Sequence, residues 1–298
     1  MRIDYRRVIS MVLALLQVMI SLTLHAVEPY GPADAKITIV VMDPMSAPLA
    51  CDCVQGYAQR KYENLADYLR EKTGFTVRVV WSESLVTALK SQAKTVQIVI
   101  GKDSVVRNDA KEAKRNLLPI AQLTDMNGST QQKGLFVVLQ DNPAATLLDL
   151  ENYKILFGPA DCDEKDSAPK KKLKELEIDF QAGEICASCS IGAKKLTELD
   201  AKGKFATVIS SYAGPLLEGC GTIKKGDLKV IGESDSVPFI SAFVDSSLSP
   251  EVRQSITTAM LAMNQSPVML KALETKLGFL PYAVAESAQE KKRDTSVP

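Results

Sequence analysis

The chain has 298 residues, of which 46% are hydrophobic and 24% charged, a composition typical of globular proteins and a length that suits two domains. Lysine plus arginine and aspartate plus glutamate number 36 each, so the formal net charge is zero. A neutral chain lacks the basic excess that binds nucleic acids and anionic membrane surfaces, and we expect neither as a partner.

The first 26 residues have the pattern of a secretory signal peptide. Arg2, Arg6 and Arg7 precede an apolar run over residues 8–24, and the small residue Ala26 offers a cleavage site. Cleavage would give a periplasmic protein without stable membrane insertion. An uncleaved anchor is the alternative, because the run approaches the ~20 residues that span a bilayer.

The single histidine of the chain, His25, lies within this predicted signal. The mature protein would then contain no imidazole, which excludes Ser-His-Asp and Cys-His catalysis and zinc sites with histidine ligands. We therefore expect a binding protein rather than an enzyme, with no cofactor.

The mature chain begins with alternating strand and helix patterns. Three apolar runs rich in β-branched residues predict buried strands, and the segments between them have helical spacing. Gly74 is typical of a helix C-terminus. The alternation predicts a parallel α/β unit. The predicted strands are residues 35–42, 75–81 and 96–100, and the predicted helices are residues 57–72 and 82–91.

A second α/β unit is predicted from residue 135 onward, and we expect the final strand and helices to fold back on the first unit. Its strands end in turns that contain Gly or Pro. The predicted strands are residues 135–139, 153–157, 205–210, 228–231 and 239–244, and the predicted helices are residues 147–150, 170–177, 250–264 and 267–277.

This order predicts two lobes between which the chain crosses twice. Lobe 1 would contain residues 27–134 and 238–284, lobe 2 residues 135–237, and residues 285–298 a flexible tail. Ligands of such sheets bind beyond the carboxyl ends of the strands, and two connections allow the lobes to close on a small molecule.

Four stretches resemble, in order, segments of the phosphate/phosphite/phosphonate-type solute-binding proteins of ABC transporters. They are KYENLADYLREKTGFTVRVVWSESL (61–85), QIVIGKDSVV (97–106), GLFVVLQDNPAATLLDLENYKILFG (134–158) and SDSVPFISAFVDSSLSPEVRQSITTAML (234–261). The resemblance implies a type II periplasmic binding fold with a central cleft and two crossover strands. It also implies a small, phosphate- or phosphonate-like anionic ligand and an ABC permease or sensor as partner. We expect a monomer.

The loop after the lobe-two strand departs from the family pattern. In phosphonate binders it is usually rich in Ser and Thr, whereas residues 160–167 keep a single hydroxyl, Ser167, among four carboxylates. Carboxylates repel a phosphonate dianion, which predicts a subgroup with its own ligand. They could instead bind Ca²⁺ or a cationic solute, or stabilise the first turn of a helix. The four are Asp161, Asp163, Glu164 and Asp166.

Four loops at the carboxyl ends of predicted strands should face the cleft. Their hydroxyls, together with backbone N–H groups at helix N-termini, suit an anion, and a lysine adds charge. The alternative is that Ser104, Ser167 and Ser211 merely cap helices. The candidate ligand-binding residues are Asp43, Ser46, Lys102, Ser104, Ser167, Ser210, Ser211 and Tyr212.

An even number of cysteines in an exported chain favours disulfides, and Cys162 with Cys186 or Cys189, near Cys220, is our structural interpretation. The alternative function is a cysteine-based metal-binding or thiol-redox accessory protein. Against thioredoxin-like chemistry, Gly192 predicts an early interruption of any helix after the C-x-x-C motif. The six cysteines are Cys51, Cys53, Cys162, Cys186, Cys189 and Cys220.

Overall fold

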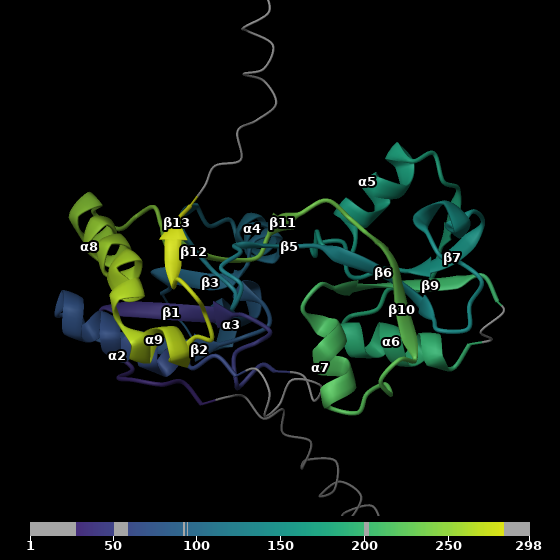
Figure 1. Cartoon of the computed structure of the whole chain (residues 1–298). Helices are drawn as coiled ribbons and strands as arrows, with labels where there is room; N and C mark the ends of the chain where they lie inside the picture. The colour runs from purple at the N-terminus through teal and green to yellow at the C-terminus, as the bar shows by residue number, and fades with distance from the viewer. Residues whose placement is uncertain (1–27, 51–58, 92, 94, 200–202, 283–298) are drawn as a thin grey trace, which may run out of the picture.

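Two β-sheets organise the part of the chain that the computed structural model describes, residues 28–50, 59–91, 93, 95–199 and 203–282 (Figure 1). The predicted signal peptide, the predicted tail, Cys51 and Cys53 lie outside the described residues. Within the described residues, every helix is too short or too polar to cross a lipid bilayer.

The larger sheet is mixed and draws its strands from distant parts of the chain. The three strands nearest the N-terminus pair in parallel, and the three later ones join by antiparallel pairing. In spatial order the strands are β13 (Phe279–Pro281), β4 (Leu117–Leu123), β12 (Ile240–Asp245), β3 (Ile98–Lys102), β1 (Ile37–Met42) and β2 (Val77–Trp81).

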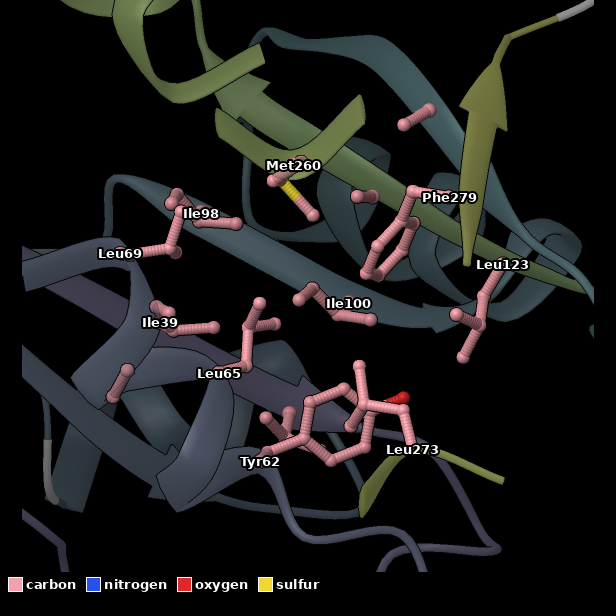
Figure 2. Close-up of a cluster of buried hydrophobic side chains, with 14 of the residues drawn as sticks. Ile39, Tyr62, Leu65, Leu69, Ile98, Ile100, Leu123, Met260, Leu273 and Phe279 are labelled. Carbon is pink, nitrogen blue, oxygen red and sulfur yellow. The ribbon is translucent and has the colours of Figure 1, made fainter. Parts of the chain in front are cut away.

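Helices cover both faces of this sheet. They are α2 (Tyr62–Thr73), α3 (Leu85–Ser91), α4 (Asp103–Glu112), α8 (Pro250–Leu261), the 3-10 helix η2 (Ala262–Gln265) and α9 (Pro267–Ala272). Successive residues of a strand point to opposite faces. In β1, Ile39 and Val41 therefore join the core beneath α2, α8 and α9, while Val40 and Met42 join the core beneath α3 and α4. Figure 2 shows the first of these cores, with Tyr62 among its side chains.

The smaller sheet has the same layered construction. Its strands, in spatial order, are β10 (Leu228–Glu233), β6 (Gly134–Leu139), β9 (Phe205–Ser210), β7 (Tyr153–Leu156) and β8 (Phe180–Ala182). Its helices are the 3-10 helix η1 (Leu147–Leu150), α5 (Ser167–Glu175), α6 (Cys189–Thr197) and α7 (Ala213–Gly219). Leu173 of α5 packs with Phe136 on one face, and Leu196 of α6 and Leu217 of α7 pack with Ile209 on the other.

Two short strands join the sheets. Strand β5 (Gln131–Gln132) carries the chain away from β4, and β11 (Val237–Pro238) carries it back to β12. The two pair antiparallel with each other in the space between the sheets (Figure 1). We call the larger sheet with its helices lobe 1 and the smaller sheet with its helices lobe 2. This is the two-lobe α/β fold with two crossover strands predicted from the sequence.

Gly192 shows where the sequence interpretation was wrong. It does not interrupt a helix but lies inside α6, which begins at Cys189 directly after the C-x-x-C spacing. A Cβ atom at position 192 would lie 2.7 Å from Thr207 Oγ1 of β9. The glycine therefore allows α6 to approach the sheet closely, which is a packing requirement that local helix propensity does not express.

Candidate ligand-binding cleft

A cavity of about 520 Å³ lies between the lobes, at the carboxyl ends of β1 and β3. Lobe 1 contributes Met42, Met45 and Lys102 to its lining, and lobe 2 contributes residues of the loop after β7, the start of α6 and Tyr212. The walls are largely apolar, with a few polar groups between them, which is the usual make-up of a small-molecule site.

The central polar contact of the cleft joins the two lobes. Lys102, the last residue of β3, donates from Nζ to Oε1 of Glu164 at 2.5 Å and to Sγ of Cys162 at 3.4 Å. Ser210, the last residue of β9, donates to the same Glu164 oxygen at 2.9 Å, and the Cys162 thiol donates to Oε2 at 3.0 Å. The side chain of Glu164 is 1% exposed, so this carboxylate is fully enclosed by its donors.

In this pair, each charge stabilises the ionised form of the other, which burial alone would disfavour. Burial by itself would raise the pKa of Glu164, but the charge and hydrogen bond of Lys102, helped by the Cys162 hydrogen bond and the Lys165 charge, together outweigh burial and lower that pKa to about 2. Burial would likewise lower the pKa of Lys102, but the Glu164 charge holds it well above its ordinary value. Burial raises the pKa of Cys162 to about 12, so this thiol is protonated near neutral pH and is a poor nucleophile or soft-metal ligand.

A second contact between the lobes involves Ser104, in the first turn of α4. Its hydroxyl donates to the backbone oxygen of Asp161 at 2.7 Å and accepts from the backbone N–H of Asp163 at 3.1 Å. Ser104 therefore ties the start of a lobe-1 helix to the loop after β7 of lobe 2.

Lys165 is a cleft residue that sequence reasoning missed. It lines the cavity, is 4% exposed, and donates from Nζ to the backbone oxygen of Ala187 at 3.2 Å. Among the described residues no carboxylate forms an ion pair with it. Its place in the loop predicted to face the cleft, directly after Glu164, was the signal that could have identified it.

Asp43 and Ser46 are buried in lobe 1 and do not line the cavity. Asp43 Oδ2 accepts from the Arg60 guanidinium at 2.8 Å and from the Tyr62 hydroxyl at 2.6 Å. Ser46 donates to the backbone oxygen of Asp43 at 2.8 Å. These two side chains hold the loop after β1 in shape, and Met45 of the same loop reaches the cavity instead.

The remaining predicted residues divide between the cleft and its surroundings. Tyr212 lines the cavity, and its ring stacks on Phe239 of lobe 1 with the centroids 5.3 Å apart. Burial raises the pKa of Tyr212. Ser211 accepts from the backbone N–H of Lys133 at 3.3 Å, and Ser167 donates to Asp163 Oδ1 at 2.6 Å, so both bond within lobe 2.

A larger cavity of about 1120 Å³ lies on the other side of Tyr212, beside β5 and α9. Tyr212 and Met45 line both cavities and so separate them. Lobe 2 contributes only Ser211 and Tyr212 to the larger one. We place the candidate site in the smaller cavity because both lobes build its walls and Lys102 and Lys165 line it.

The acidic loop does not form a metal centre in the described part of the chain. Glu164 is held by Lys102, and Asp166 pairs with Lys170 of α5 at 2.5 Å. No cluster of three or more histidine, cysteine, aspartate or glutamate side chains among the described residues is arranged to hold a metal ion.

All four described cysteines are free thiols, which contradicts the disulfides expected in lobe 2. Each sulfur faces a different neighbour: Cys162 faces Glu164, Cys189 faces Ser210, and Cys220 bonds Thr222 at 3.1 Å. Cys186 is buried beside α6 and directs its sulfur toward the backbone oxygen of Glu184. Cysteines that are close in the sequence, such as Cys186 and Cys189, therefore direct their sulfurs toward different neighbours.

Three solved structures share this architecture at low sequence identity. XAC2383 from Xanthomonas citri bound to ATP is 14% identical, with a TM-score of 0.61 over 86% of this chain and 93% of its own. The binding-protein component of an ABC phosphonate transporter from Pseudomonas aeruginosa is 14% identical, with a TM-score of 0.62 over 83% and 81%. PhnD1 from Prochlorococcus marinus in complex with methylphosphonate is 12% identical, with a TM-score of 0.62 over 86% and 96%.

These likenesses establish the type II periplasmic binding fold. The comparison with curated sequences gives no match. A family model described as "ABC transporter, phosphonate, periplasmic substrate-binding protein" matches residues 55–289, which is most of the chain. The chain therefore belongs to the family of periplasmic substrate-binding proteins of phosphonate ABC transporters, as its sequence motifs predict.

Proposed function

We propose that this protein is an exported solute-binding protein that closes its two lobes on a small anionic solute and presents it to an ABC permease or a sensor. Family membership supports the general role. The cleft between the lobes supports this proposal, because its volume of about 520 Å³ suits a small molecule.

We propose an anionic solute because of the buried Lys165 ammonium. Burial of a charge is unfavourable unless the charge is paired, and Lys165 is buried in the cleft wall with one backbone acceptor and no ion-pair partner among the described residues. An ammonium has three donors, so Lys165 has N–H bonds left for a ligand. An anionic group at this point would satisfy them.

Contacts that need both lobes support the proposed closure. Lys102 with Glu164, and Ser104 with the loop after β7, form only when the lobes meet. A solute that contacts both walls binds the closed state better than the open one and shifts the population toward it. The apolar side chains of Met42, Met45 and Tyr212 exclude water from the closed cleft.

The test is a calorimetric titration of the mature chain with a panel of small carboxylates, sulfate, phosphate and methylphosphonate, with neutral and cationic solutes of similar size as comparison. We expect binding of anions only, with a fall in the radius of gyration measured by small-angle X-ray scattering. Lys165→Met should weaken that binding at least about tenfold, the value of one charge-assisted hydrogen bond.

Lys133→Met is the matched control, because Lys133 also lies beside lobe 2 but is exposed, pairs with Glu233 and does not line the cleft. It should bind the same solute with wild-type affinity. Equal affinities of Lys165→Met and the wild type would contradict the proposed site, and a preference for cationic solutes would contradict the proposed function.

A further inference from the structure

The surroundings of Glu164 are those of a bound anion. An ammonium from β3, a hydroxyl from β9 and a thiol from its own loop donate to its two oxygens. Cations, hydroxyls and other polar hydrogens converging on an oxyanion make an anion-binding site. Here the anion is a carboxylate of the chain itself, and it is enclosed between the lobes.

This internal site adjoins the cleft. Lys102 and Cys162 line the cavity and also contact Glu164, so they separate the carboxylate from the space for a solute by one layer of side chains. Shortening residue 164 would extend the cavity between these donors and leave Lys102 with its charge unpaired.

Among the described residues that line the cleft, Lys165 is the lysine left to pair with a negative charge of the solute. Two lysines, Lys102 and Lys165, line the cleft, and Glu164 neutralises the first. Asp161 and Glu83 also line the cavity, and their charges disfavour a dianion more strongly than a monoanion. A dianion would place its second charge near the carboxylate of Glu164, where the described residues that line the cleft offer no further unpaired cation.

We propose that Glu164 is a specificity-determining residue that fills the place of a second anionic charge and restricts the cleft to singly charged anions. This inference rests on the proposed function, because it names the class of solute that the cleft accepts. The loop after β7 thereby excludes the phosphonate dianion, through a residue that supplies its own carboxylate to Lys102.

The experiment compares the wild type with Glu164→Ala, Glu164→Gln and the double variant Lys102→Met/Glu164→Ala. Acetate, sulfate and methylphosphonate are the probes, and potassium chloride of equal ionic strength is the reference. Acetate is informative because it has the atoms that Glu164→Ala removes, namely a carboxylate and one further carbon. Thermal unfolding and calorimetric titration are the two measurements.

We expect acetate to raise the Tm of Glu164→Ala above its value in the salt reference by several degrees, and to raise that of the double variant much less. Methylphosphonate and sulfate should bind Glu164→Ala at least about tenfold more tightly than they bind the wild type, because one repelling charge has gone and Lys102 is free. Glu164→Gln keeps the shape of the side chain and loses its charge, so it should also bind the two dianions more tightly than the wild type. It serves as the test if the alanine variant does not fold.

Two outcomes would overturn the proposal in different ways. If sulfate or methylphosphonate binds the wild type as tightly as it binds the variants, Glu164 does not select against dianions, although solute binding stands. If neither the wild type nor any of the variants binds any of the anions, solute binding itself is refuted. The proposed role of Glu164 is then refuted as well. Glu233→Gln, an exposed acid of lobe 2, should behave as the wild type throughout.

Discussion

In two ion pairs of the described residues both side chains are buried, and one pair lies within lobe 1 whereas the other joins the lobes. Within lobe 1, Asp43 accepts from Arg60, and the two side chains are 0% and 2% exposed. Across the cleft, Lys102 donates to Glu164, and these side chains are 10% and 1% exposed. A hydroxyl completes each pair, that of Tyr62 on Asp43 and that of Ser210 on Glu164.

The two pairs differ in whether they require the two lobes to be in contact. Asp43, Arg60 and Tyr62 lie within 19 residues of one another in the same lobe, so their contacts do not depend on the lobe angle. Lys102 and Glu164 are 62 residues apart and belong to different lobes. The first pair therefore stabilises the fold, whereas the second stabilises one arrangement of the lobes.

The largest effect is expected for Asp43→Asn, which leaves the Arg60 guanidinium buried without its counter-charge. Breaking a buried pair in this way costs about 3–5 kcal/mol. Urea denaturation should show this loss in the free energy of unfolding. Glu71→Gln is the control, because its pair with Lys72 is exposed and should contribute no more than about 1 kcal/mol. Equal losses in the two variants would contradict a special role for Asp43.

The pH dependence of stability tests the Lys102–Glu164 pair. The pKa of Glu164 falls from 4.5 to about 2 on folding, so its stabilisation is present above pH 4.5 and is lost as the pH falls toward 2. The lost contribution is on the order of 3 kcal/mol. We expect Glu164→Gln to have a flatter stability profile than the wild type between pH 5 and about 2, as measured by denaturation at each pH.

Glu175→Gln, at an exposed position of α5, should keep the wild-type profile in this titration. Parallel profiles of the wild type and Glu164→Gln would show that the Lys102–Glu164 pair is not closed in solution.

The smallest effect is expected for Ser104→Ala. It removes two hydrogen bonds between the lobes, which together contribute about 2 kcal/mol. Because the bonds cross the cleft, the loss should favour the open arrangement and increase the radius of gyration of the ligand-free protein in small-angle X-ray scattering.

Ser167→Ala is the matched control for this variant, since its bond to Asp163 lies within lobe 2. It should change stability by a similar amount without changing the radius of gyration. An equal increase in both variants would mean that Ser104 does not act between the lobes.

The sequence predicted eight strands, β1, β2, β3, β6, β7, β9, β10 and β12, because their signal is local. The apolar run of β1 buries both faces, and each side of it meets a helical layer. The pattern was less informative where structure depends on packing. Strand β4, which contains Pro119, was not predicted, and α4 begins at Asp103 directly after β3, although we interpreted residues 101–104 as a loop that faces the cleft.

The site was harder to predict than the fold because its chemistry depends on pairing. Lys102 ends a strand and lines the cavity, but the sequence could not show that Glu164 would neutralise it. Asp43 follows a strand as a ligand-binding residue would, yet its carboxylate turns inward to Arg60. Strand order predicts which loops meet, and only three-dimensional contacts reveal which side chains are already satisfied.

The crossing of the chain between the lobes has a consequence for any movement of this molecule. Strands β5 and β11 are hydrogen-bonded to each other, so the two crossings bend together. A pair of tied crossings resists sliding and independent twisting, and leaves rotation about one axis as the easiest motion. We therefore expect a single distance between two labels, one on each lobe, to follow the proposed opening and closing.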